Sequence, residues 1–233
     1  MKYAVVAAVV ALLVLAWVPD RDLACAHVFY ISGGHFMGNA PIGIAARNVA
    51  KFAPLLLFVG LLLLHIASRI GLIAASHTPS GRSLLFLTLS LALGPGLLVN
   101  LLKDEMHRPR PSQIREFGGK LAFMPFYSPY GACPRNCAFP SGEAAAAFWM
   151  AAPASLAPLP LRPALTTLAL LFGLMTGGLR MAAGAHFLSD ILSAGVLTLT
   201  LNAALRRLPL PGSPREFSDR VESPDREESA PNQ

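Results

Sequence analysis

Charged side chains are scarce in this sequence of 233 residues: Asp, Glu, Lys and Arg together make up 14%, whereas hydrophobic residues make up 54%. An ordinary soluble domain carries about 25% charged residues, so this class is excluded. Internal repeats are not evident, and there are only three cysteines. The few carboxylates form no cluster that would hold a metal ion, and neither a metal nor another cofactor is expected.

The hydrophobic residues are instead concentrated in long runs. With their small and polar flanks, six runs approach the roughly 20 apolar residues that a membrane-spanning helix needs. They occupy residues 3–18, 52–67, 84–102, 144–160, 165–179 and 191–205. We therefore predict an all-α fold, a polytopic membrane helical bundle with about six transmembrane helices, of which the fourth and fifth have the least distinct boundaries.

The two ends of the chain need separate interpretation. Lys2 precedes the first run and small residues follow it, as in a signal peptide, but the run is long and "WVPDRD" is a poor cleavage region. A retained helix is therefore favoured, within one transmembrane domain over residues 1–208. Residues 209–233 combine Pro, Ser and alternating charges without an apolar face, which predicts a disordered cytoplasmic tail.

The distribution of positive charge indicates how the chain is oriented. With six spans both termini lie on one side, and if this is the cytoplasm the short loops follow the positive-inside bias. The loop between the third and fourth spans breaks the bias, because six cations would lie outside: Lys103, Arg108, Arg110, Arg115, Lys120 and Arg135. Either the topology is inverted or these cations have a task that outweighs the bias. The net charge of +6 is otherwise explained by contact with anionic lipid.

Two of the three cysteines, Cys133 and Cys137, lie in the same loop, in "CPRNC". Disulfides persist outside the reducing cytoplasm, so a Cys133–Cys137 bridge would agree with an external loop. Two unpaired thiols are the alternative. A metal site is disfavoured, because no second Cys/His pair lies near enough in sequence to complete four ligands.

Three polar clusters interrupt the apolar pattern, and the first is "KDEMHRPRP". Lys103 supplies a compact charge and Arg110 a planar fork, which together suit a phosphate group. The prolines at 109 and 111 end the third helix and place the arginines on stiff extended backbone. Taken alone, the cluster is equally consistent with a basic collar that contacts lipid headgroups.

The second cluster is "PSGE", directly before the fourth apolar run. Ser141 is suited to cap a helix that starts here, and Gly142 would let a ligand approach the backbone closely. The free N–H groups of a helix start bind anions. Without the other clusters, a simple helix cap would be the better interpretation.

The third cluster contains Arg180, His186 and Asp190. If a helix starts near His186, the spacing of four places Asp190 on the same face, where it can accept the imidazole N–H and leave the other nitrogen free as a nucleophile. A lone membrane histidine is often only a satisfied polar residue, but ionisable groups at the edge of a span are candidates for function. By the six-span count, all three clusters emerge on one face of the membrane.

The ordered set K-x6-RP, PSG and R-x5-H-x3-D resembles the type 2 phosphatidic acid phosphatases, a superfamily of metal-independent lipid phosphatases that also includes vanadium haloperoxidases. The resemblance covers the third to sixth spans. It implies a helical bundle in which His186 attacks phosphorus to give a phosphohistidine and Asp190 orients it. Lys103, Arg110, Arg180 and the Ser141/Gly142 region would stabilise the phosphoryl oxygens.

One position departs from this family, which usually has histidine as the general acid where this chain has Glu143. A glutamate can donate a proton to the leaving alcohol when protonated, or activate water when ionised. Acid/base work is the favoured prediction for Glu143. The alternatives are a structural partner for Arg108 or Arg135, or loss of the acid step with His107 as substitute.

The predicted substrate is a lipid phosphate displayed on the periplasmic side of the bacterial inner membrane. The stretches "FGG" and "CPRNCAFPSGEA" favour a lipid A phosphatase of the 4′ type by their similarity to such enzymes. Undecaprenyl diphosphate and phosphatidylglycerophosphate are the alternative substrates. A lipid transporter, supported by mid-span His65, and a non-catalytic scaffold are the competing classes. The bilayer and the lipid are the expected partners, with no nucleic acid and no obligate protein partner.

Overall fold

The computed structural model describes residues 2–74 and 78–208 and is predominantly helical. The predicted tail, residues 209–233, lies outside the described residues. The α-helices are α1 (Lys2–Trp17), α2 (Asp20–His27), α3 (Pro41–Arg69), α4 (Gly81–Leu91), α5 (Val99–Met106), α6 (Gly142–Trp149), α7 (Ala151–Leu156), α8 (Arg162–Ala182) and α9 (Leu188–Leu205). A short hairpin, β1 (Tyr30–Ser32) and β2 (His35–Phe36), follows α2, and a π-helical segment, η3 (Ala92–Leu98), joins α4 to α5. The 3-10 turns are η1 (Met37–Asn39), η4 (Pro111–Gln113) and η5 (Arg115–Phe117).

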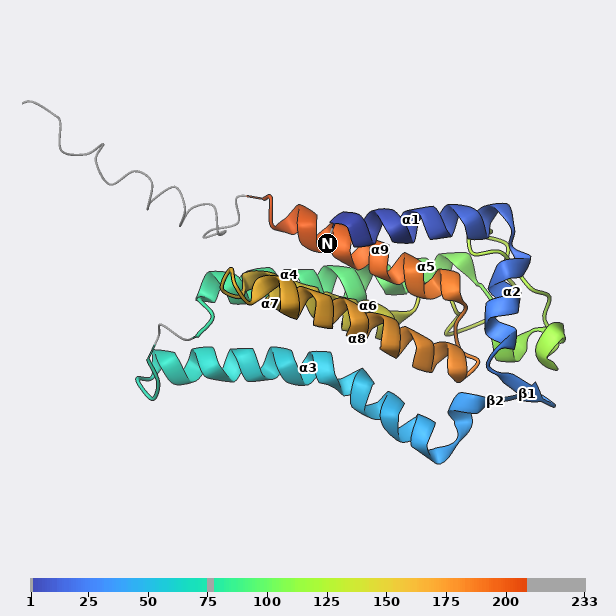
Figure 1. Cartoon of the computed structure of the whole chain (residues 1–233), viewed down its shortest axis with the longest axis horizontal. Helices are drawn as coiled ribbons and strands as arrows, with labels where there is room; N and C mark the ends of the chain where they lie inside the picture. Colours follow the sequence, from blue (N-terminus) through green and yellow to red (C-terminus); the bar gives the residue numbers. More distant parts are fainter. Residues whose placement is uncertain (1, 75–77, 209–233) are drawn as a thin grey trace, which may run out of the picture.

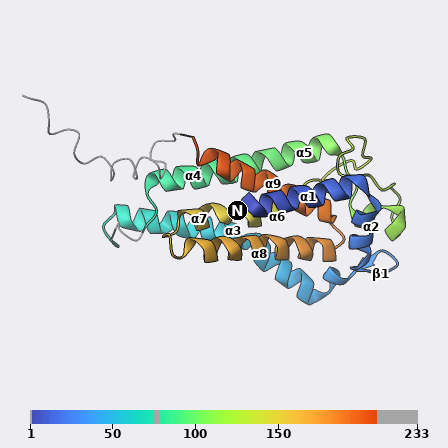
Figure 2. The ribbon, with the colours of Figure 1, turned by 45° about the horizontal axis from the view of Figure 1, so that its top comes forward.

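The long helices lie side by side along the long axis of the molecule, as Figures 1 and 2 show. Helix α2 and the hairpin lie at one end, and the C-terminal end of α3 and the start of α4 lie at the other. Helix α6 is at the centre of the bundle, where it packs against α8 and α9. Its neighbours approach closely because they carry glycine: a Cβ at Gly173 would lie 2.3 Å from the Phe148 ring. Small residues at such contacts are typical of helix packing in membranes.

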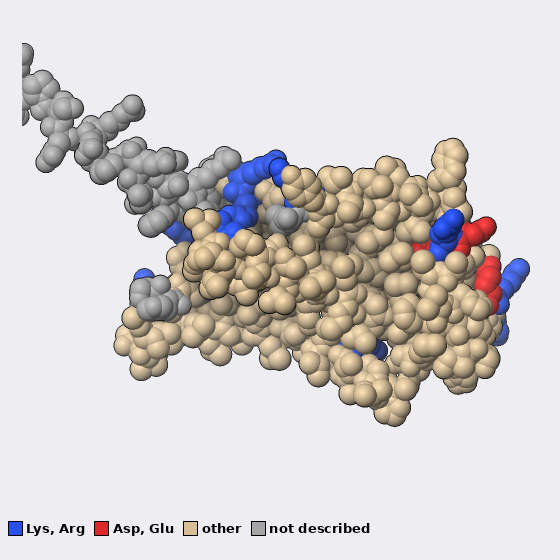
Figure 3. All heavy atoms as spheres, viewed as in Figure 1, with Lys and Arg blue, Asp and Glu red and all other residues tan. Residues whose placement is uncertain are grey.

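The surface has the distribution of charge expected of a membrane protein. On the face in Figure 3, charged residues gather at the two ends, and the band between them is largely uncharged. Large apolar side chains on the outer helices are exposed, including Ile42 at 82%, Val49 at 73% and Leu56 at 67%. Because such exposure in water would be a large aggregation-prone patch, these helices are suited to contact lipid.

The number of spans differs from the predicted six. Within residues 2–74 and 78–208, four helices or helix series are long and apolar enough to cross a membrane: Pro41–Arg69, Gly81–Gln113, Arg162–Ala182 and Leu188–Leu205. Helices α1 and α2 together are also long and apolar enough, but they are bent by 106° at the break between them. They add a fifth span if this bent pair forms one broken span. The all-α prediction is confirmed, whereas the count of six is not.

The predicted fourth span is not among these helices. Helices α6 and α7 contain eight and six residues, separated at Met150. Pro153 has no N–H to bond the carbonyl of Trp149, which explains the break at this point. Even a continuous helix of this length would extend only about 21 Å, short of the roughly 30 Å of the hydrocarbon core. The segment is therefore an inner helix that begins at the site described next.

Candidate active site

The second and third predicted clusters meet where α6 and α9 begin. Ser141 caps α6, as predicted, because its hydroxyl accepts from the backbone N–H of Ala144 at 3.4 Å. Its own backbone N–H donates to the carbonyl oxygen of Asp190 at 3.2 Å. Gly142, the first residue of α6, lies so that a Cβ there would be 3.9 Å from Cε of Lys103. The start of α6 therefore contacts residues of both other clusters.

His186 and Asp190 are both buried and face each other, with Nδ1 of His186 at 3.5 Å from Oδ2 of Asp190. The helix starts two residues later than predicted, at Leu188, so that His186 precedes it. Oδ2 of Asp190 also accepts from the backbone N–H of Phe187 at 2.8 Å and so caps its own helix. The loop and the helix start together hold the pair that the spacing of four predicted.

The environment of His186 keeps the ring neutral. The pKa of His186 is lowered from the usual 6.5 to about 4: burial lowers it most, Asp190 raises it, and the charges of Lys103 and Arg180 add a smaller lowering. A neutral imidazole has a lone pair for a nucleophilic attack at physiological pH.

Asp190 is in turn held by a buried network that the sequence interpretation did not foresee. The fully buried Arg108 donates from Nη1 to Oδ1 of Asp190 and from Nη2 to Oδ2 of Asp22, the latter at 2.7 Å. Asp22 lies on α2 and accepts from the backbone N–H of Ser189 at 3.0 Å and from the Ser189 hydroxyl. The guanidinium of Arg108 also lies 4.4 Å from the centre of the Phe187 ring. The N-terminal part of the chain thereby contributes to the start of α9.

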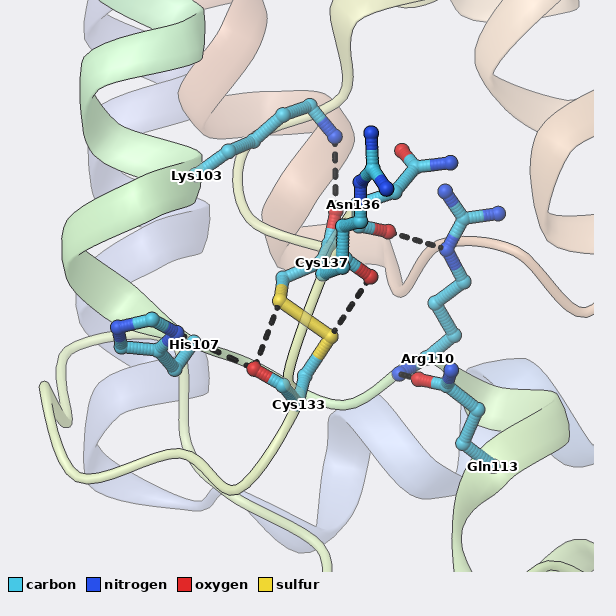
Figure 4. The surroundings of a disulfide bond; sticks show 8 residues. Lys103, His107, Arg110, Gln113, Cys133, Asn136 and Cys137 are labelled. Atoms are coloured by element: carbon cyan, nitrogen blue, oxygen red, sulfur yellow. Dashed lines mark hydrogen bonds between the residues drawn. A yellow bond between two sulfur atoms is a disulfide. The ribbon is translucent and has the colours of Figure 1, made fainter.

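Lys103 and Arg110, the cations of the first cluster, are held by the loop that contains the two cysteines. Cys133 and Cys137 are joined by a disulfide in the structure, with their Cα atoms 5.7 Å apart. Nζ of Lys103 donates to the Cys137 carbonyl at 2.8 Å, and Nε of Arg110 donates to the Asn136 carbonyl at 3.0 Å (Figure 4). Because the bridge closes this short loop, the carbonyls that orient both cations are fixed relative to each other.

Glu143 lies among cations, but its partners are not those considered from the sequence. Two nitrogens of Arg47 contact its carboxylate, Nη2 at 3.1 Å from Oε1 and Nε at 3.4 Å from Oε2. Nε of Arg180 lies 3.6 Å from Oε2. The partners considered from the sequence were Arg108 and Arg135. Arg108 instead binds the two aspartates, Asp22 and Asp190.

The cations and Glu143 share one electrostatic environment: the charges of Arg110, Arg180, Asp190 and Glu143 all act on the Lys103 ammonium. The eight predicted residues from the three clusters are thus brought to one place. Two residues were missed, Asp22 and Arg47. For Arg47 there was a signal, since it is an ionisable residue at the edge of an apolar run.

Two histidines considered from the sequence lie elsewhere. His107 is exposed and hydrogen-bonds the Cys133 carbonyl at 3.1 Å, on the other side of the disulfide from Arg110 in Figure 4. The ring of His65 has a backbone partner, the Pro79 carbonyl at 2.8 Å, so it is a satisfied polar residue of α3. Among residues 2–74 and 78–208, no three His, Cys, Asp or Glu side chains are grouped closely enough to hold a metal ion.

Comparison with known proteins agrees with this arrangement. Residues 83–210 match the PAP2 superfamily, and the chain belongs to this family. It is also similar to three proteins named lipid A 4′-phosphatase. The one from Francisella tularensis subsp. novicida is 30% identical over 193 residues, 78% of this chain and 85% of that protein. Those from Rhizobium etli and Rhizobium leguminosarum are 42% and 41% identical over 120 residues, 51% of this chain.

The chain matches about half the length of each Rhizobium protein, 47% and 52% respectively. No solved structure matches this chain.

Proposed function

We propose that this membrane protein is a metal-independent lipid phosphatase that removes the 4′-phosphate of lipid A. The observation that carries the proposal is the buried, neutral His186, with Asp190 on one ring nitrogen, in the same electrostatic environment as Lys103 and Arg180. The substrate class is supported by the relatives named lipid A 4′-phosphatase.

In this mechanism Nε2 of His186 attacks phosphorus, and the bond from phosphorus to the sugar oxygen breaks as the nitrogen–phosphorus bond forms. Asp190 accepts the Nδ1–H and stabilises the positive charge that the ring acquires. Lys103, Arg110, Arg180 and the N–H groups at Gly142 bind the phosphoryl oxygens, where negative charge must be held in the transition state.

Glu143 is the proposed proton-handling residue. In its protonated form Glu143 passes its proton to the leaving sugar oxygen. The carboxylate so formed, which is the form that Arg47 and Arg180 stabilise, then removes a proton from the water that attacks the phosphohistidine. Inorganic phosphate leaves as the nitrogen–phosphorus bond breaks, and neutral His186 is restored.

The site is proposed to face the periplasm from the bacterial inner membrane. The Cys133–Cys137 disulfide supports this side, because disulfides persist in the periplasm and are rare in the cytoplasm. Lipid A displayed on the outer face of that membrane would then reach the site without crossing it.

Mass spectrometry of membrane lipids tests the substrate. Cells that produce the protein should convert lipid A to a form lighter by one phosphate, with the loss at the 4′ position. Cells with His186→Asn, a variant of similar size, should keep both phosphates. Conversion of the undecaprenyl diphosphate or phosphatidylglycerophosphate pool with intact lipid A would contradict the proposed substrate but retain the reaction.

A further inference from the structure

Arg47 is the cation of the site that lies outside the three clusters and outside the residues matched to the family. It belongs to α3, 96 residues from Glu143 in sequence, and meets both carboxylate oxygens with two different nitrogens. Such a two-point contact between guanidinium and carboxylate is stronger and better oriented than a single hydrogen bond. The side chains are 34% and 18% exposed, so the pair is only partly screened by solvent.

The second neighbour of Glu143 is Arg180, which the proposed function needs for phosphate. Nε of Arg180 is buried and has no hydrogen-bond partner within the described residues, although it lies 3.6 Å from Oε2 of Glu143. A carboxylate at this distance competes with a phosphate for the same guanidinium. It also repels the phosphate, because both are anions. A site with Glu143 and without Arg47 would therefore bind phosphate poorly.

We propose that Arg47 is a positioning residue of the phosphate site: it neutralises Glu143 and turns its carboxylate so that Arg180 remains available to the substrate. This inference rests on the proposed phosphatase function. Arg47 thus balances the charge introduced by a glutamate where the family usually has histidine. In Figure 3, Lys or Arg atoms lie at the bottom of a hollow beside the N-terminal half of α3.

The role predicts a specific dependence between two residues. If Arg47 acts through Glu143, its removal harms phosphate binding only while Glu143 carries its charge. If Arg47 instead contacts the phosphate directly, its removal is harmful whichever residue stands at 143. A double-mutant cycle separates the two cases.

The experiment measures binding of inorganic phosphate to the full-length protein in detergent, by titration calorimetry, so that it does not depend on turnover. The variants are Arg47→Ala, Arg47→Lys, Glu143→Gln and the double variant Arg47→Ala/Glu143→Gln. Lys51→Ala is the matched control, because it removes an exposed cation from the same helix one turn away. Melting temperatures without phosphate report whether each variant is folded.

Arg47→Ala should weaken phosphate binding about tenfold, the size of a coupling between neighbouring charges. The double variant should return to within about twofold of Glu143→Gln, and Lys51→Ala should match the wild type. Arg47→Lys keeps the charge but not the two-point contact, so a smaller loss is expected, again relieved by Glu143→Gln. This variant carries the same test if Arg47→Ala does not fold.

Unchanged binding in Arg47→Ala, or an equal loss with and without Glu143→Gln, would overturn the role of Arg47. Absence of phosphate binding by the folded wild type would instead contradict the proposed function itself.

Discussion

At the scale of single residues, the site depends on a histidine that burial keeps neutral. Burial lowers the pKa of His186 most, Asp190 opposes it, and smaller effects of Lys103 and Arg180 again lower this pKa. The proposed nucleophile is therefore available over a wide pH range, since a histidine with a pKa of about 4 is about nine-tenths neutral at pH 5.

This leads to a prediction on pH. The His186 ring should show no titration between pH 8 and 5 when its resonance is followed by NMR in protein labelled at histidine Cε1. The His186→Asn spectrum identifies the resonance among the six histidines. A midpoint near 6.5 would contradict the account.

The lowered pKa of His186 also determines how the stability of the folded protein changes with pH. The folded-state pKa is depressed, so between about pH 6.5 and 4 the unfolded chain binds the proton that folded His186 refuses. The contribution of His186 to stability is thus complete above the unfolded pKa and is lost as pH falls through this window.

Residues of the clusters could be predicted because each chemical type and spacing has its own local signal. The partners of those residues could not, because they come from remote parts of the chain. Asp22 is 167 residues from Ser189, and neither its neighbours nor its spacing marks it as different from Asp20. The alternative partners considered for Glu143 failed for the same reason.

At the scale of helices, α2 stabilises the start of α9 from outside. The Asp22 carboxylate accepts the Ser189 N–H, one of the helix-start donors that otherwise have no partner, and it holds Arg108 against Asp190. The helix that carries Asp190 and directly follows His186 is therefore capped by a helix that precedes the family match.

Asp22→Ala should accordingly reduce both stability and turnover. It leaves a buried arginine with one of its two carboxylates, and breaking such a pair costs about 3–5 kcal/mol. The thermal midpoint should fall. The decrease in kcat should exceed the change in KM, because Asp190 loses its orientation whereas the cations that bind the phosphate stay in place. Asp20→Ala, which removes an exposed carboxylate from the same helical turn, is the control. Equal effects of the two substitutions would contradict the role of Asp22.

The positions of the helices could be predicted from the sequence better than the number of helices that cross the membrane. Each of the six apolar runs contains helix, because hydrophobicity and helix propensity are local properties. Whether a helix crosses the membrane depends on its length and surroundings, and α6 and α7 are too short because Pro153 interrupts them. In the third run, the chain passes Pro95 as a π-helical segment without ending the span.

At the scale of the whole molecule, the bundle places a polar site at one end of an apolar body. The ends of the face in Figure 3 are charged and the band between them is largely uncharged, so a bilayer would cover the band and leave the site near one interface. A lipid phosphatase needs this placement, because the phosphate of its substrate lies at the interface while the acyl chains remain in the membrane.

The central claim is that His186 becomes covalently phosphorylated, and a rapid-quench experiment tests it most directly. Purified protein is mixed with lipid A carrying a ³²P label at the 4′-phosphate, quenched in base, where phosphohistidine survives, and digested for peptide mapping. The account predicts label on the peptide containing His186, formed and lost at rates that match turnover, and no label with His186→Asn. Turnover without a labelled peptide, or label on another residue, would contradict it.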